Sequence, residues 1–373
     1  ALSDCHAMCA DAHSALAIVT VPYGVQKEVE ETIFQVMAGA CAVLQEAGCA
    51  LVGGHTAEGA ELSLGFAVNG VAREGLVLQK GGMRSGDKVI ITKSVGTGAL
   101  FAAHMRGLID GPAVMNALRE MKKSNQAAAR ILRDTGAATC CTDITGFGVV
   151  GHLLEMLKAS DDNDKFNKHF LLEHRYFGAE IDLDALPIMD GAVDALSQGV
   201  TSSLQSSNLT ARRGIIGATD DSAGQNAIRA HKAYPLLFDP QTAGGLLATV
   251  PADKIADTLR QLQQLGFEAA CVLGTVMQVP SAVERIKVVV SEDASQNAAV
   301  AVTKRRTKGI KRRGGVTAVV SAFIWPENRG LHEPKRAGGA GAGRQLLLGL
   351  LLGLATAYLW RAVGDSFSSP ARE

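Results

Sequence analysis

Three short segments of the sequence combine glycine or helix-start positions with side chains that bind phosphate or metal ions. In the first, Leu51–Glu61, Gly53 and Gly54 follow an apolar run and precede His55. Two glycines after a strand let the main chain approach a ligand, and the free N–H groups of such a turn hold phosphate oxygens. The same spacing fits a plain strand-to-loop turn, and it matches neither a P-loop nor a G-x-G-x-x-G fingerprint.

The second segment, Thr142–His152, places Asp143 in a glycine-rich loop just before an apolar helix. A carboxylate there can ligate Mg²⁺ while backbone amides face a phosphate. The alternative is a helix cap, in which Asp143 or Thr145 satisfies the first turn of the helix after Gly148.

The third segment, Ser3–Met8, carries Asp4 near the start of a short helix, where a carboxylate acts either as a ligand or as a cap. Cys5 and Cys9 lie four residues apart, but no fourth ligand follows at a usable spacing, so zinc is not predicted. A further segment, Phe238–Leu247, predicts a tight turn with packed glycines and a structural role.

Around these segments, strand and helix patterns alternate, which predicts an α/β (α+β) fold. The polar, turn-rich stretch Gln79–Asp87 divides the pattern into two units, and Asp161–Lys168 is predicted to be an exposed insertion. In the first unit we expect a capped helix at Ser3–Met8, strands at Ala15–Val21, Cys49–Val52 and Leu62–Val71, and a helix at Gln26–Ala47. In the second we expect a strand at Lys88–Thr92, helices at Ala99–Arg106, Pro112–Asp134, Gly151–Ala159 and Asp253–Leu265, and strands near Ala269–Gly274 and Ile286–Val290.

Composition excludes several classes of function. Lys+Arg and Asp+Glu both number 37, so no whole-molecule field attracts nucleic acid, and an aromatic content of 5% argues against base-stacking surfaces. The 7 cysteines form no CxxC pair, which favours a reducing, cytoplasmic location over a secreted disulfide framework.

The C-terminal part differs in composition from the rest. Residues 292–344 read as a basic and glycine-rich linker, and residues 345–363 as an apolar tail. The uncharged run Gln345–Trp360 spans about 24 Å as a helix, short of the roughly 30 Å hydrocarbon core of a bilayer. The tail is therefore a candidate membrane anchor of marginal length, and a buried helix is the alternative.

Taken together, the sequence motifs of these segments resemble those of selenophosphate synthetase (selenide, water dikinase), and the resemblance runs from Ala1 to about Val290. The shared motifs are Ala-Leu-Ser-Asp-Cys-His-Ala-Met, Gly-Gly-His-Thr-x-Glu-Gly, Ile-Thr-Lys-x-x-Gly-Thr-Gly, Thr-Asp-Ile-Thr-Gly-Phe-Gly-x-x-Gly-His and Asp-Pro-Gln-Thr-Ala-Gly-Gly-Leu-Leu. The resemblance implies a two-domain aminoimidazole ribotide synthetase-like fold and ATP-dependent synthesis of selenophosphate from selenide, with release of AMP and phosphate. It also implies bound ATP and Mg²⁺, and a homodimer whose N-terminal domains form a shared β-barrel.

Carried over by residue, the resemblance assigns ATP and metal binding to Asp4 and a second metal-ligand role to Asp143. It assigns nucleotide contacts, made from the partner subunit, to Gly53, Gly54 and His55. The expected domains are an incomplete N-terminal ATP-binding domain at 1–80 and a C-terminal domain at 84–291.

No catalytic nucleophile is assigned, because the family's reactive cysteine or selenocysteine and its nearby lysine precede the matching part of this chain. Cys9 stands where the family has a glycine, which is expected to crowd the turn beside Asp4. We therefore expect an N-terminally incomplete copy that is inactive by itself. A non-catalytic nucleotide-binding relative and a membrane-tethered scaffold are the alternatives.

Overall fold

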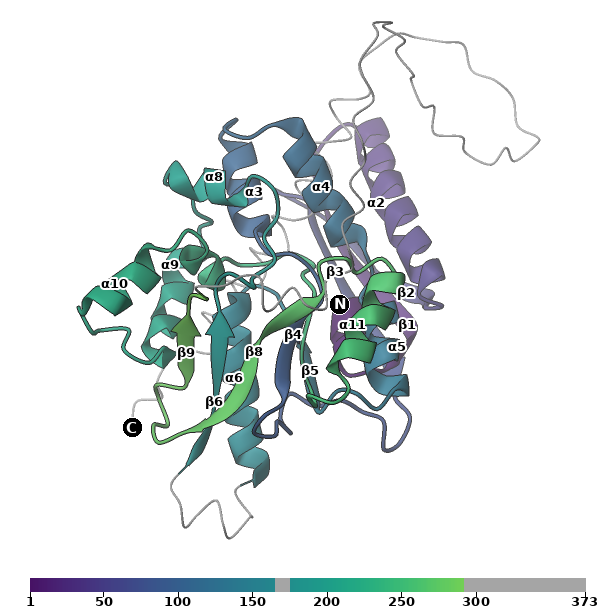
Figure 1. The fold of residues 1–373 in the computed structure, drawn as a ribbon. Coiled ribbons are helices and arrows are strands. Elements are labelled where there is room, and N and C mark those ends of the chain that lie inside the picture. Colours follow the sequence, from purple (N-terminus) through teal and green to yellow (C-terminus); the bar gives the residue numbers. More distant parts are fainter. Residues whose placement is uncertain (165–174, 292–373) are drawn as a thin grey trace, which may run out of the picture.

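The computed structural model describes residues 1–164 and 175–291, and these form two β-sheets with flanking helices (Figure 1). One sheet has three strands in the order β2-β1-β3, and the other has six in the order β5-β7-β4-β8-β6-β9. This mixture of helices and parallel and antiparallel strands confirms the predicted α/β (α+β) class.

The three-stranded sheet has β1 (Asp11–Pro22) at its centre, parallel to β2 (Ala50–Gly59) and antiparallel to β3 (Ser63–Val71). Helix α2 (Gln26–Glu46) connects β1 to β2 and packs against one face of the sheet, because its apolar residues recur at helical spacing. The predicted helix at Gln26–Ala47 is thus confirmed to within one residue.

The six-stranded sheet has two covered faces. In β4, Val89 and Ile91 pack against α6, whereas Ile90 packs against α5 and α11 on the other side. Its strands are β4 (Lys88–Ile91), β5 (Cys140–Asp143), β6 (Tyr176–Asp182), β7 (Leu246–Val250), β8 (Cys271–Val279) and β9 (Ile286–Val289). The helices around it are α3 (Thr97–Met105), α4 (Gly111–Lys122), α5 (Gln126–Asp134), α6 (Gly148–Asp164), α8 (Ala192–Ser197), α9 (Gln205–Asn208), α10 (Ala223–Ala230) and α11 (Ile255–Gln264).

The prediction of one helix over Pro112–Asp134 was wrong. The chain forms α4 and α5, because Lys123 between them takes an extended conformation, with ψ 115°. Its carbonyl oxygen accepts a hydrogen bond of 2.5 Å from Lys93 Nζ. A buried lysine that follows β4 thus binds the carbonyl group that a continuous helix would use for its own hydrogen bond.

The exposed insertion predicted at Asp161–Lys168 was also wrong at its start. Asp161 lies in the last turns of α6, is buried, and pairs with Arg285. Its second carboxylate oxygen accepts the Phe177 N–H at 2.9 Å. Residues 165–174 lie outside the described part.

The prediction that Gly53 and Gly54 end a short buried strand was wrong as well. β2 continues to Gly59 as an exposed edge strand, with an irregularity in the register after Leu51. A Cβ atom on Gly54 would stand 1.9 Å from the carbonyl oxygen of Ala17. The glycine lets two backbones approach each other within a sheet, and it does not form a turn.

Among residues 1–164 and 175–291, no helix is long and apolar enough to cross a membrane. The predicted linker, residues 292–344, and the apolar tail, residues 345–363, lie outside the described part of the chain.

Candidate functional site

Helix α1 (Leu2–Ala7) lies between the two sheets and packs against β5 and α5. The Nδ2 atom of Asn125 donates one hydrogen bond to Ser3 Oγ and another to the Gly244 carbonyl, both at 2.9 Å. Gly244 precedes β7, in which Leu246 pairs with Asp143 of β5. Asn125 therefore connects the helix that carries Asp4 with the strand pair that carries Asp143.

Asp143 is the last residue of β5, and 8% of its surface is exposed. Among the described residues, no side chain or backbone amide donates a hydrogen bond to its carboxylate. The helix-cap interpretation of Asp143 is thus not supported. A nearly buried carboxylate without a partner is costly, so its oxygens are suited to an external cation.

Lys93, two residues after the end of β4, is 2% exposed and places a cation in the same region. Its Nζ atom donates to the carbonyls of Lys123 and Ala243, and Ala243 adopts a φ of +50°, which non-glycine residues rarely do. Burial lowers the pKa of Lys93 to about 8, and the charges of nearby carboxylates, Asp143 among them, act in the opposite direction. The sequence analysis did not assign Lys93, although a lysine directly after a buried strand of β-branched residues was a usable signal.

Asp4 differs from Asp143 in being exposed, with 77% of its side chain accessible. It pairs with the N-terminal ammonium of Ala1 at 3.5 Å, and no side chain of the described residues caps α1, so the cap interpretation of Asp4 is wrong. The neighbouring His6 is buried, and its Nε2 atom has no partner among the described residues. Burial lowers the pKa of His6 to about 4, so its ring is neutral at pH 7.

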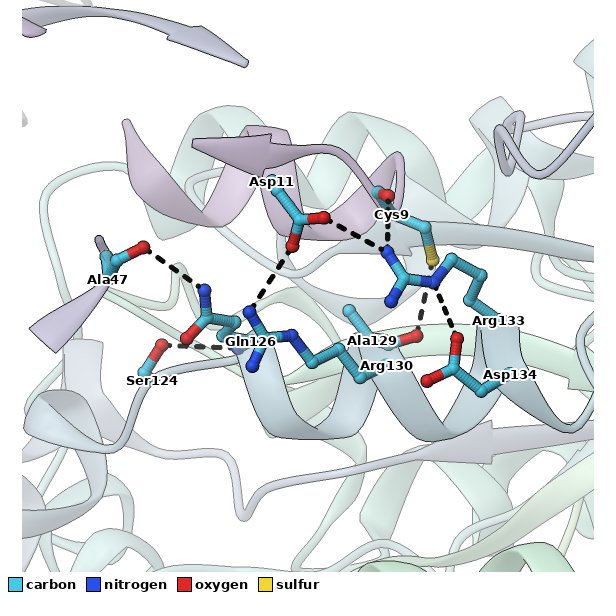
Figure 2. Close-up of polar contacts among 9 residues, drawn as sticks. All are labelled: Cys9, Asp11, Ala47, Ser124, Gln126, Ala129, Arg130, Arg133 and Asp134. Atoms are coloured by element: carbon cyan, nitrogen blue, oxygen red, sulfur yellow. Dashed lines mark hydrogen bonds and ion pairs between the residues drawn. The ribbon is translucent and has the colours of Figure 1, made fainter. Parts of the chain in front are cut away.

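An ion-pair cluster attaches the three-stranded sheet to α5 (Figure 2). Asp11 of β1 pairs with Arg130 at 3.3 Å and with Arg133 at 3.5 Å, and Arg133 also pairs with Asp134 at 2.8 Å. Cys9, where a glycine was expected, has a φ of +57°, and its Sγ atom donates to the Ala129 carbonyl. The turn after α1 is therefore held directly against α5.

Gly53, Gly54 and His55 lie elsewhere. They are exposed on β2, the edge strand that packs against β1 and α2. The structure brings together the elements that carry Asp4 and Asp143, and it leaves the other three predicted contacts on the other sheet.

The turn at Phe238–Leu247 has the structural role that the sequence predicts. Asp239 Oδ2 accepts the Gly98 N–H at 3.0 Å, and Gln241 Oε1 accepts the N–H groups of Gly96 and Thr97. Burial raises the pKa of Asp239 to about 7. These side chains hold the first turn of α3.

The donor set limits which metal the site can hold. Within the described ranges, no group of three His, Cys, Asp or Glu side chains could hold a metal ion. Mg²⁺, unlike zinc, is usually bound through one or two carboxylates together with substrate phosphates and water. Asp143 and Asp4 therefore fit Mg²⁺ that arrives with a nucleotide.

Two adjoining cavities of about 410 and 400 Å³ lie beside α4, and both are lined by Asn116 and Asp190. The second also includes Lys123 and Ser94, next to Lys93. Neither is lined by Asp4 or Asp143, so neither contains the two predicted metal ligands.

Comparison with known proteins identifies the family. The model of the AIR synthase related protein N-terminal domain matches residues 1–72, and that of its C-terminal domain matches residues 84–163. The selenide, water dikinase of Pelobacter propionicus is 32% identical, over 77% of this chain and 75% of its own. That of Carboxydothermus hydrogenoformans is 33% identical, over 72% and 71%.

Among solved structures, hydrogenase maturation protein HypE in complex with ATP superimposes with a TM-score of 0.56. The two sequences are 15% identical, and the match covers 77% of this chain and 72% of HypE. This likeness shows that the two share a fold. Together with the curated relatives, it shows that the chain belongs to the selenide, water dikinase family of phosphotransferases and has the AIR synthase fold.

Proposed function

We propose that this protein uses ATP to convert selenide into selenophosphate, with release of AMP and phosphate. The observation that carries the proposal is the carboxylate of Asp143 at the end of β5, which is nearly buried and has no hydrogen-bond partner among residues 1–164 and 175–291. Asn125 connects its strand pair with the helix of Asp4. Membership of the selenide, water dikinase family supports this reaction, and ATP in the HypE structure supports nucleotide binding on this fold.

In this proposal, Asp143 and Asp4 hold Mg²⁺ together with the ATP phosphates. The ion, when bound, neutralises negative charge that develops on the transferred phosphoryl group. Lys93 holds the carbonyls of Lys123 and Ala243, and thereby keeps the ends of β4 and of the Ala243 turn in place beside Asp143. Asn125 fixes α1, so that Asp4 stays at the same edge of the sheet.

Six of the 7 cysteines are poor candidates for the nucleophile. Burial raises the pKa of Cys9 to about 11 and the pKa of both Cys140 and Cys271 to about 12. It also raises the pKa of Cys5, Cys49 and Cys141. Because the thiolate is the reactive form, we assign the nucleophile to none of these six.

We further propose that a second copy of the chain covers the open face of the three-stranded sheet. Leu16 and Ile18 of β1 are 40% and 57% exposed there. In register, they stand beside Gly53 and His55 of β2. A homodimer through this face would bury the apolar side chains and bring the Gly53–His55 strand to an interface, where these residues are expected to contact nucleotide.

The dimer is tested by replacing Ile18 with Asp and measuring mass by sedimentation velocity. We expect the variant to be monomeric under conditions in which the parent protein is dimeric. The matched control is Phe34→Asp on α2, where the side chain is 62% exposed. A monomeric parent, or a dimeric Ile18→Asp protein, would show that this face is not the contact.

The reaction is tested by ³¹P NMR on the protein produced from its complete reading frame. We expect a selenophosphate signal, with AMP and phosphate, that depends on both selenide and ATP. Binding of ATP·Mg²⁺ without any turnover would instead identify a non-catalytic nucleotide-binding relative. Turnover that is independent of selenide would contradict the proposed substrate.

A further inference from the structure

Behind the loop that follows Asp143, a chain of polar side chains runs from the surface to the backbone of Thr145. Lys80 Nζ pairs with Glu155 Oε2 at 3.0 Å, and His152 Nδ1 lies 3.3 Å from the same oxygen. On the other side of the ring, the N–H of Thr145 donates to His152 Nε2 at 3.0 Å. His152 is 4% exposed, so this contact is shielded from water.

These contacts determine the tautomer of His152. A ring nitrogen that accepts a backbone N–H carries no proton, so Nε2 is the acceptor and Nδ1 holds the hydrogen. The Nδ1–H then donates to Glu155, whose carboxylate is also paired with the ammonium of Lys80. The carboxylate therefore orients the ring, as carboxylates do for histidines at metal sites.

Three other backbone groups of this loop are hydrogen-bonded to other elements. Ile144 N–H donates to the Gly245 carbonyl at 2.9 Å, and the Thr145 carbonyl accepts the Gln241 N–H at 3.0 Å. Asn208 Nδ2 donates to the Gly146 carbonyl at 2.7 Å. The Thr145 N–H, which lies two residues after Asp143, is held from the α6 side by His152.

We propose that His152 is a positioning residue for the metal ligand Asp143. Its Nδ1-protonated ring, oriented by Glu155 and Lys80, holds the Thr145 amide and so fixes the direction of the Asp143 carboxylate. This inference rests on the proposed function only in so far as that function makes Asp143 a ligand of Mg²⁺. The arrangement of the side chains behind the loop can be tested without any turnover.

The first test is the protonation of the ring, measured by ¹⁵N NMR of histidine-labelled protein. We expect the hydrogen of His152 on Nδ1 in the parent protein. The opposite tautomer would overturn the proposal, because its Nε2 could not accept the Thr145 N–H.

The second test compares His152→Gln with His152→Leu. The glutamine amide oxygen reaches about as far as Nε2 and can accept the same N–H, whereas leucine fills the space without an acceptor. His104→Leu, on α3, is the matched control for loss of a histidine. We expect His152→Leu to weaken Mg²⁺-dependent binding of an ATP analogue about 10- to 100-fold, the range seen when residues behind metal ligands are changed.

Hydrogen exchange at the Thr145 amide gives a readout that needs no nucleotide. We expect exchange to be at least about tenfold faster in His152→Leu and near the parent rate in both His152→Gln and His104→Leu. Unchanged exchange and unchanged binding in a folded His152→Leu protein would overturn the proposal. If His152→Leu does not fold, His152→Gln decides, because loss of protection there would equally contradict the acceptor role.

The results separate this inference from the proposed function. A protein with the expected tautomer and exchange pattern but no selenophosphate synthesis would contradict the function and leave the hold on Thr145 intact. A protein that makes selenophosphate, loses it in Asp143→Asn and keeps it in His152→Leu would contradict the positioning role alone.

Discussion

The two sheets of this molecule differ in how completely the chain covers them. In the six-stranded sheet, every residue of β5 and β7 is buried, and helices cover both faces. In the three-stranded sheet, α2 covers one face, while β2 is exposed along most of its length. A sheet covered on both sides fixes its end residues by its own packing. The packing of this chain therefore fixes the place of Asp143, whereas Gly53, Gly54 and His55 lie exposed on β2 and, in our proposal, contact a second copy of the chain.

The largest expected effect concerns the ligand that the buried sheet places. Asp143→Asn keeps the size of the side chain and removes the charge proposed to hold Mg²⁺. We expect turnover to fall about a thousandfold or more, because metal stabilisation supplies several kcal/mol and each 1.4 kcal/mol corresponds to a factor of ten. The thermal midpoint should stay near that of the parent protein. Turnover is followed by ³¹P NMR.

Asp182→Asn on β6 is the matched control, because this side chain is also 8% exposed and belongs to the same sheet. It should keep its turnover. Asp4→Asn should resemble Asp143→Asn, since both aspartates are proposed to hold the same ion. Normal turnover in Asp143→Asn would remove this residue from the site.

The next effect is a pH dependence of opposite sign at two positions, His6 in α1 and Asp239 beneath α3. His6 has a pKa of about 4 when folded against 6.5 unfolded, so its contribution to stability is lost as the pH falls from 6.5 to 4. Asp239 has a pKa of about 7 when folded against 3.8 unfolded, so its contribution is lost as the pH rises from about 4 to about 7. At about 1.4 kcal/mol per pKa unit, the contribution of His6 is roughly 3 kcal/mol and that of Asp239 roughly 4 kcal/mol.

Urea unfolding at pH 4.5 and pH 7 measures both contributions. Relative to the parent protein, His6→Gln should gain stability on acidification, because its protonation no longer favours the unfolded chain. Asp239→Asn should lose relative stability over the same interval. If both variants shift in the same direction, one of the two burial effects has been assigned the wrong sign.

A third effect tests the close approach of β1 and β2 in the open sheet. Gly54→Ala places a Cβ atom 1.9 Å from the Ala17 carbonyl, so the strands must separate. We expect a loss of about 1–3 kcal/mol in the free energy of unfolding, as for other overpacked sites. Gly65→Ala on β3 is the control, because a Cβ there meets nothing within 4 Å. Equal stability of the two variants, measured by urea unfolding, would exclude the close approach.

Sequence alone predicted what periodicity and local motifs encode. The bounds of α2 and β3 follow from apolar spacing, and Asp143 could be proposed from the sequence because its motif is local. Gly53 and Gly54 were wrongly predicted to end the strand, because a pair of glycines suits a turn as well as a close contact between two strands. Asn125, Lys93 and His152 were not found as parts of the site, since their roles depend on tertiary contacts. Asn125 and Ser3, for example, are 122 residues apart in the chain.

The smallest effect concerns the contact that joins the two regions. Ser3→Ala removes the hydroxyl that accepts a hydrogen bond from Asn125 Nδ2, while the bond from the same nitrogen to Gly244 remains. We expect a loss of about 1 kcal/mol, the usual net value of one such hydrogen bond. Hydrogen exchange should place this loss in α1, with β4 and β7 unchanged.

Ser197→Ala, which removes an exposed hydroxyl from α8, is the control. A loss spread evenly over both sheets would show that α1 unfolds only with the whole molecule. A loss confined to α1 would mean that Asp4 can separate from the site while Asp143 stays fixed.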